Sequence, residues 1–155
     1  MIVWLTGQPG SGKTTLAERF INDKLIWFMR IQPHRIMHID GDDLRDVLDN
    51  KDYSEKGRRK NIQFAIDMAK VMDNKGFIVV VSLVSPYRDM REKLKSNRNV
   101  TEFYLHTTDI RGKEDYFVDD YEPPLHNFVD MDTDKTIEEC VDEILDVYRQ
   151  MATVA

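Results

Sequence analysis

The stretch MIVWLTGQPGSGKT, residues 1–14, decides the fold of this 155-residue chain. Its first six residues are a continuous apolar run that stops at a glycine, which is typical of a β-strand buried on both faces of a sheet. A helix is predicted to begin near Gly12 and Lys13, with Leu16, Ala17 and Phe20 facing inward. The chain therefore opens with a strand, a tight glycine turn and a helix.

Residues 7–14 match the pattern G-x-x-x-x-G-K-[ST] in full. The glycines allow successive backbone N–H groups to point into one concavity that suits a phosphate, and the helix that follows directs its positive dipole end at the same point. In such a loop Lys13 reaches the β- and γ-phosphates, and the Thr14 hydroxyl ligates Mg²⁺. We therefore predict a P-loop with ATP as co-substrate and Mg²⁺ as cofactor.

The rest of the chain alternates apolar runs with amphipathic segments, without repeats or a linker. Strands are predicted at 35–40, 77–84, 101–106 and 127–131, and helices at 42–49, 55–74, 86–96 and 134–150. Ser54 is a predicted N-cap, Gly76 a helix stop and Pro86 a first-turn residue, while Thr133 or Asp134 caps the last helix. The segment 25–33 fits either more helix or a loop.

This alternation predicts an α/β fold in three layers: a parallel sheet flanked by helices, of the P-loop nucleoside-triphosphate-hydrolase-like kind. We expect one domain over residues 1–155.

The charge and composition narrow the choice of partner. The formal net charge is −6, from 28 acidic and 22 basic residues, and this disfavours a nucleic acid as partner because such binding depends on neutralising phosphates. No apolar run reaches the ~20 residues that span a membrane, and the N-terminus lacks a basic region. The single cysteine, Cys140, lies in a helical apolar stripe and fits a reducing compartment. We expect a cytoplasmic protein without a membrane partner.

The segment DGDDLR, residues 40–45, follows the second predicted strand. It should emerge at the carboxyl edge of the sheet, where ligands bind in open α/β folds. A carboxylate at Asp40 could there hold Mg²⁺ through water or accept the proton of an attacking hydroxyl. Asp42 or Asp43 could instead only cap the following helix. The guanine-recognition pattern of GTPases is missing, so the short chain favours a small-molecule kinase.

Several segments match one family in order and spacing: WLTG (4–7), GSGKTTLA (10–17), DGDDLR (40–45), YS (53–54), RRKNI (58–62), AKVM (69–72), VSPYR (84–88), YEPP (121–124) and DT (132–133). On these residues the chain resembles the adenylylsulfate (APS) kinases. The resemblance implies a kinase of sulfate assimilation that transfers the γ-phosphate of ATP to a hydroxyl of a small anionic acceptor, with APS as the leading candidate.

The resemblance also implies roles for individual residues. Asp40 and Lys13 would be catalytic, and Thr14 and Asp40 would hold the metal. The ATP-binding residues would be Gly7, Gln8, Pro9, Gly10, Ser11, Gly12, Lys13, Thr14, Thr15 and Arg111, the last from Arg111-Gly112-Lys113, a remnant of the lid that covers ATP. By resemblance Arg45, Asn61, Ser85 and Pro86 would bind the acceptor. Asp42 joins these acceptor-binding residues because of its position after the second strand, and Arg59 because of its charge.

The charge pattern of the predicted helix 55–74 suggests Arg59 as an acceptor-binding residue. Lys56, Arg58, Arg59 and Lys60 crowd the first turns of the helix predicted at 55–74, where each cation opposes the helix dipole by about 0.3–1 kcal/mol. The cluster is either a solvated basic face or an anion site, and we favour the anion site.

The chain departs from the family in its acceptor half. Gln63 and Phe64 stand where the family usually carries an arginine pair, and the lid is shorter, with Tyr116 or Phe117 as the only candidates to stack on an adenine. The alternatives to APS as acceptor are a different small anion and a nucleic-acid hydroxyl. The alternative to a kinase is a nucleotide-binding regulator without catalysis. A homodimer is left open, and residues 27–29 fit either the core or its interface.

Overall fold

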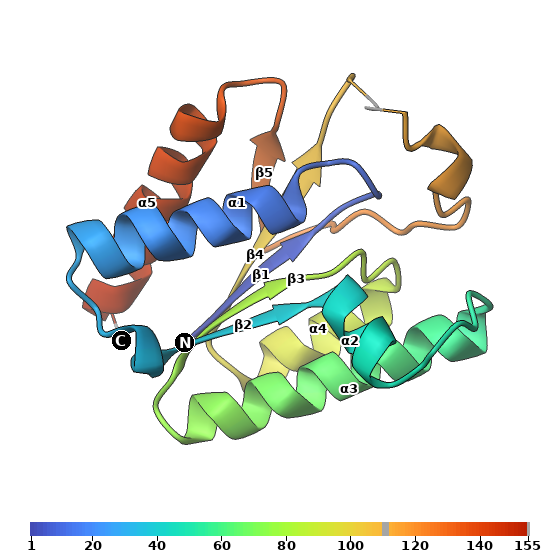
Figure 1. Cartoon of the computed structure of the whole chain (residues 1–155), viewed down its shortest axis with the longest axis horizontal. Coiled ribbons are helices and arrows are strands. Elements are labelled where there is room, and N and C mark those ends of the chain that lie inside the picture. Colours follow the sequence, from blue (N-terminus) through green and yellow to red (C-terminus); the bar gives the residue numbers. More distant parts are fainter. Residues whose placement is uncertain (110–111, 155) are drawn as a thin grey trace.

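The structure is a computed structural model that describes residues 1–109 and 112–154 (Figure 1). Its centre is a five-stranded sheet in the order β2-β3-β1-β4-β5, and every neighbouring pair is parallel. The strands are β1 (Ile2–Thr6), β2 (Ile36–Asp40), β3 (Ile78–Ser82), β4 (Val100–His106) and β5 (Val129–Asp132). The parallel α/β prediction is confirmed.

Helices cover both faces of this sheet, as Figure 1 shows. One face carries α1 (Lys13–Arg19), the π-helical segment η1 (Phe20–Phe28) and α5 (Ile137–Val154), and the other carries α2 (Gly41–Val47), α3 (Glu55–Asn74) and α4 (Arg88–Asn97). Two short 3₁₀ turns, η2 (Pro33–Arg35) and η3 (Glu114–Tyr116), lie in the connections. The three-layer arrangement therefore follows the predicted one.

Strand β1 lies in the middle of the sheet and is buried along its whole length. Because successive strand side chains point to opposite faces, Val3 and Leu5 pack with α1 and α5, whereas Ile2 and Trp4 pack beneath α3 and α4. Both faces of β1 must therefore be apolar, which explains its unbroken apolar run.

Two predicted helix starts differ from the structure. The last helix begins at Ile137, and its cap is Thr136 rather than Thr133 or Asp134: Glu139 N donates to Thr136 Oγ1, and Thr136 N donates to the Glu139 carboxylate. This reciprocal capping box satisfies two free N–H groups at once. Helix α4 begins at Arg88, two residues after Pro86, so Pro86 belongs to the preceding turn.

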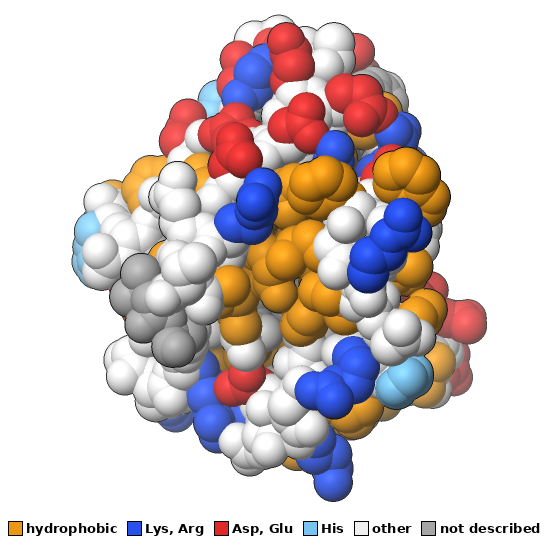
Figure 2. All heavy atoms as spheres, turned by 90° about the vertical axis from the view of Figure 1, so that its left-hand side faces the viewer, with side chains coloured by type: hydrophobic (Ala, Val, Ile, Leu, Met, Phe, Trp, Pro, Cys, Tyr) orange, Lys and Arg blue, Asp and Glu red, His pale blue; other side chains and the backbone are white. Residues whose placement is uncertain are grey.

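The ambiguous segment 25–33 is partly helical, because η1 continues the first helix as far as Phe28. Trp27 and Phe28 then lie on the surface, 67% and 54% exposed, and not in the core. Figure 2 shows that end of the molecule, where hydrophobic side chains gather between basic ones. Arg30 stacks on Trp27, and Arg149 lies over Phe28.

Among the described residues, no helix is long and apolar enough to cross a membrane.

A buried ion cluster that the sequence analysis did not predict joins α4 to β4. Arg91 and Glu102 are 2% and 1% exposed, with Arg91 Nε donating to Glu102 Oε1 at 2.7 Å. Lys95 Nζ completes the cluster by contacting Glu102 Oε2 at 2.5 Å. The remaining Arg91 nitrogens donate to the backbone carbonyls of Ser85 and Glu122, both at 2.5 Å. Each of these buried charges therefore has a partner, as burial requires.

We predict that Arg91→Ala lowers the free energy of unfolding by about 3–5 kcal/mol, because Glu102 would lose its main buried counter-ion. Urea denaturation followed by circular dichroism measures this. The matched control is Arg59→Ala, which removes a surface arginine that is also paired with carboxylates and should cost about 0–1 kcal/mol. Equal losses in the two variants would contradict the assignment of the buried cluster as a major stabilising element.

Candidate active site

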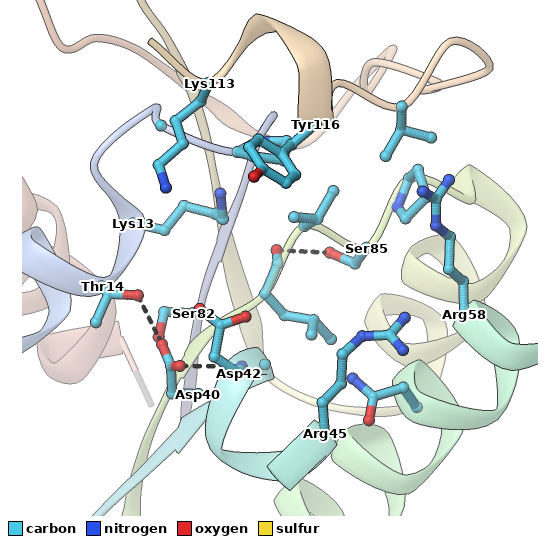
Figure 3. Close-up of a pocket in the computed structure, with 18 of the residues that line it drawn as sticks. Lys13, Thr14, Asp40, Asp42, Arg45, Arg58, Ser82, Ser85, Lys113 and Tyr116 are labelled. Atoms are coloured by element: carbon cyan, nitrogen blue, oxygen red, sulfur yellow. Dashed lines mark hydrogen bonds between the residues drawn. The ribbon is translucent and has the colours of Figure 1, made fainter. Parts of the chain in front are cut away.

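A cavity of about 790 Å³ lies at the carboxyl ends of the strands. Figure 3 shows that its walls come from separate parts of the chain: the loop before α1, the start of α2, one side of α3, and the segment around Lys113 and Tyr116 above them. The strand order brings these segments together, because in a parallel sheet all strands end at the same edge.

The glycines of the loop after β1 adopt backbone angles that favour glycine. Gly10 and Gly12 have φ angles of 82° and 98°, in the left-handed region. A Cβ on Gly7 would come within 2.4 Å of the Leu105 carbonyl oxygen, so this position needs glycine for a close approach to β4. The loop therefore has the curled backbone that a phosphate site requires.

Lys13 lies in this loop and is only 8% exposed. Its Nζ donates to the Gln8 carbonyl oxygen at 2.8 Å and to Ser11 Oγ at 3.4 Å. Burial lowers the pKa of Lys13 to about 8, even though the nearby Asp40 and Asp42 carboxylates favour its charged form. Within residues 1–109 and 112–154 the acceptors of its hydrogen bonds are neutral oxygens, and a buried ammonium of this kind is well suited to meet an anion.

The structure places the predicted ATP-binding residues in two groups. Those that line the cavity are Pro9, Gly10, Gly12, Lys13, Thr14 and Thr15. Gly7, Gln8 and Ser11 support the loop from behind: the Gln8 side chain exchanges two hydrogen bonds of 2.9 Å with the Val118 backbone, and Ser11 O accepts from Thr133 Oγ1. Arg111 lies outside the described residues.

Asp40 ends β2 and is the N-cap of α2, so neither Asp42 nor Asp43 caps that helix. Its Oδ1 accepts from Thr14 Oγ1 and from Ser82 Oγ, both at 2.7 Å, and its Oδ2 accepts from Asp42 N at 3.1 Å (Figure 3). Burial raises the pKa of Asp40, but the hydrogen bonds from Ser82 and Thr14 outweigh it, so the pKa lies below its ordinary value. The carboxylate is therefore ionised at neutral pH.

The sequence analysis identified neither Ser82 nor His38 as a site residue. Ser82 pairs with Asp40 across β2 and β3, and its hydroxyl also lies 2.8 Å from His38 Nε2. A polar residue at the carboxyl end of an apolar strand was the available signal. Only the strand register shows that it meets Asp40.

Five of the six predicted acceptor-binding residues line the other half of the cavity: Asp42, Arg45, Asn61, Ser85 and Pro86. Arg45 Nη1 donates to the carbonyl oxygens of Asn50 and Asp52, and its guanidinium stacks on Tyr53 at 4.1 Å. Asn61 is 2% exposed, and among the described residues its Oδ1 has no hydrogen-bond partner. A buried amide oxygen of this kind is suited to accept a hydrogen bond from a ligand.

The sixth residue, Arg59, does not line the cavity. It donates to Glu55 and Asp89 on the outside of α3 and α4, and these two carboxylates raise its pKa. Arg58 lines the cavity instead, with its side chain directed along the wall in Figure 3. Among the described residues, Arg58 forms no salt bridge. The basic cluster is therefore divided, with one guanidinium directed to the cavity and its neighbour neutralised on the surface.

The substitutions at positions 63 and 64 also lie outside the cavity. Gln63 donates to Asp67 on the outer surface of α3, and Phe64 is 41% exposed. Tyr116 and Phe117, the candidates for stacking on a base, both line the cavity, and Tyr116 is 67% exposed. Neither of these two positions therefore lines the cavity.

The turn at Ser85 is held in an unusual conformation by buried partners. Ser85 has a φ of 40°, which is uncommon for a residue with a side chain. Trp4 Nε1 donates to Ser85 Oγ at 3.0 Å, and Arg91 Nη1 holds the Ser85 carbonyl oxygen. Two buried side chains from β1 and α4 thus fix the part of the cavity wall that carries Pro86.

This fold and this loop define a protein of the P-loop class, in which the loop lines one half of a cavity and Arg45 and Arg58 line the other. A family model described as "Adenylylsulphate kinase" matches residues 1–112. The chain belongs to the adenylylsulphate kinase family.

Individual relatives agree with this assignment. An adenylyl-sulfate kinase of Chloroflexus aurantiacus is 31% identical, with 94% of this chain and 87% of that protein covered. One of Burkholderia ambifaria is 38% identical over 97 residues, which are 61% of this chain. The match spans about half the length of that relative, 50%. The solved structure of the Mycobacterium tuberculosis APS kinase CysC in complex with AMPPNP and APS has a TM-score of 0.78 at 22% identity, with 96% of both chains covered, and supports the fold.

The position of Lys13 predicts that phosphate binding weakens at alkaline pH. Below pH 8 Lys13 is charged in the free protein, whereas above it the protein has to take up a proton when an anion binds. The Kd of a non-hydrolysable ATP analogue, measured by calorimetry without metal, should rise by up to about tenfold per pH unit above pH 8. Lys13→Ala should bind weakly with little pH dependence, and a flat profile for the wild type would contradict the prediction.

Proposed function

We propose that this protein is an ATP-dependent kinase that transfers the γ-phosphoryl group to a hydroxyl of a small anionic acceptor, with APS as the first candidate. The observation that carries this proposal is the division of one cavity. The phosphate loop with Lys13 forms one half, and Arg45, Arg58 and Asn61 line the other. Two anionic ligands could therefore meet in line within it.

Lys13 and the loop N–H groups would hold the β- and γ-phosphates and stabilise the charge that spreads over the γ-phosphoryl oxygens during transfer. The acceptor oxygen forms the new bond to phosphorus, the bond to the β-phosphate oxygen breaks, and ADP leaves. The proton of the acceptor hydroxyl goes to solvent or to a product phosphate oxygen.

Asp40 fits a metal-holding role better than that of a general base. Its lowered pKa makes it a weak proton acceptor at neutral pH, and a loose phosphoryl transition state needs little help from a base. Asp40 and Thr14 present oxygens, the ligand type Mg²⁺ prefers, on side chains that touch at 2.7 Å. These two residues would hold Mg²⁺, and the bound ion would neutralise phosphate charge.

The lining of the second half of the cavity bears on the chemistry of the acceptor. Arg45 and Arg58 are cations without a carboxylate salt bridge among the described residues, which supports an acceptor that carries negative charge. The largely exposed Tyr116 supports weaker enclosure of a base than a full lid would give. A smaller anionic hydroxyl compound is therefore the second candidate.

A coupled ADP-release assay tests the function. The acceptors are APS, related sulfo- and phospho-nucleotides, and small hydroxylated anions, each with an oligonucleotide as comparison. We expect saturable turnover on one small anion, and Lys13→Ala should lower kcat by two or more decades, a loss of about 2.7 kcal/mol or more. ADP release that no acceptor stimulates would contradict the kinase proposal.

The neighbouring arginines offer a matched pair for the acceptor site. Arg58→Ala should raise the acceptor KM by about one to two decades, since a charge-assisted hydrogen bond contributes about 1.5–3 kcal/mol. Arg59→Ala, on the outer surface, should change it by less than about threefold, and the ATP KM should stay constant in both variants. A larger effect at Arg59 than at Arg58 would return the acceptor site to the outer face of α3.

A further inference from the structure

A chain of hydrogen bonds runs from His38 into the site. His38 lies on β2 two residues before Asp40, on the same side of the strand. Its Nε2 is 2.8 Å from Ser82 Oγ, and Ser82 Oγ is 2.7 Å from Asp40 Oδ1. Asp40 Oδ1 also accepts from Thr14, the residue that follows the phosphate-loop lysine. Two strands and the phosphate loop are thus joined through one carboxylate oxygen.

The direction of each bond follows from counting hydrogens. A serine hydroxyl has one hydrogen, and Ser82 gives it to Asp40, which as a carboxylate can only accept. The contact between His38 and Ser82 therefore needs its hydrogen from the imidazole, on Nε2. Both the Nε2–H tautomer and the imidazolium supply it, so this step is independent of the charge of His38.

The same counting shows which lone pair of Asp40 stays open. Oδ1 accepts two hydrogen bonds, from Thr14 and Ser82, and so uses both of its lone pairs. Oδ2 accepts one, from Asp42 N, and keeps one lone pair available to a cation or its bound water. Ser82 can occupy Oδ1 in this way only while its hydroxyl points at Asp40, and a donor at position 38 holds it there.

We infer that His38 is a positioning residue that acts through Ser82 to orient the Asp40 carboxylate for the metal that accompanies the nucleotide. This inference rests on the proposed metal role of Asp40 and Thr14. Outer partners of metal ligands commonly change metal affinity by about 10–100-fold when removed. Because His38 acts one hydrogen bond further out, we expect a smaller effect of about 3–10-fold.

Two substitutions separate positioning from packing. His38→Gln places an amide N–H about as far from the backbone as the Nε2 of histidine, so it can still donate to Ser82. His38→Asn has a similar polarity, but its amide lies at the level of Nδ1 and cannot reach the hydroxyl. The probe is a non-hydrolysable ATP analogue, whose binding to the whole protein is measured by calorimetry over a Mg²⁺ titration, together with kcat and the ATP KM.

We expect His38→Asn to raise the half-saturating Mg²⁺ concentration about 3–10-fold and to lower kcat by a similar factor, with metal-free analogue binding unchanged. His38→Gln should stay within about twofold of the wild type. In a Ser82→Ala background, His38→Asn should add no further effect, because the two residues act in series.

Two results would overturn the inference. Equal Mg²⁺ dependence in the Asn and Gln variants, with a metal-dependent wild type, would leave His38 as a packing residue and leave the proposed function intact. Analogue binding by the wild type that ignores Mg²⁺ would remove the metal role of Asp40 and the inference with it. Absence of turnover on every acceptor would challenge the proposed function alone, because analogue binding needs no acceptor.

Discussion

The hydrogen bond from Thr14 Oγ1 to Asp40 Oδ1 joins the loop after β1 to the carboxyl end of β2. Thr14 lies in the first turn of α1 after β1, and Asp40 ends β2, two strands away in the sheet. Strand β3 lies between them and contributes Ser82 to the same oxygen. Three backbone segments therefore meet at one carboxylate, and its geometry depends on the register of all three strands.

The cavity is built at an electrostatic cost that the rest of the fold offsets. Lys13 is buried and, within the part of the chain that the structure describes, forms no direct salt bridge, so burial lowers its pKa. Behind the cavity, Arg91 is buried too, but there Glu102 and two carbonyl oxygens satisfy it. The first cation is left free for a ligand, while the second ties α4, β4 and the Ser85 turn into one rigid wall.

Two neighbouring arginines on α3 show how one helical step decides which side chain reaches the cavity. Arg58 and Arg59 are adjacent on α3, so their side chains point about 100° apart around the helix axis. Arg58 faces the cavity, and Arg59 faces the carboxylates of Glu55 and Asp89. The helix-dipole argument identified the basic cluster, but charge alone cannot choose between neighbours. That choice depends on which side of α3 packs against the core.

The order of the elements, the parallel sheet and the phosphate loop could all be predicted from the sequence, because each depends on local patterns. The apolar run 1–6 and the glycines at 7, 10 and 12 specify a strand and a curled turn wherever they occur. Helix starts were predicted less accurately. Thr136 was missed as the cap because Thr133 and Asp134, a few residues earlier, are residue types that cap a helix equally well.

Only the tertiary structure decided which residues meet. Ser82, His38 and Asp40 are distant in sequence and adjacent through strand register, and Arg91 and Glu102 pair only because α4 packs on β4. No periodicity in the sequence records such contacts. The sequence thus determined an α/β protein with a P-loop on its own. The strand order determined the surroundings of the Asp40 carboxylate and of the cavity beside the loop, since hydrogen bonds form between neighbours in space.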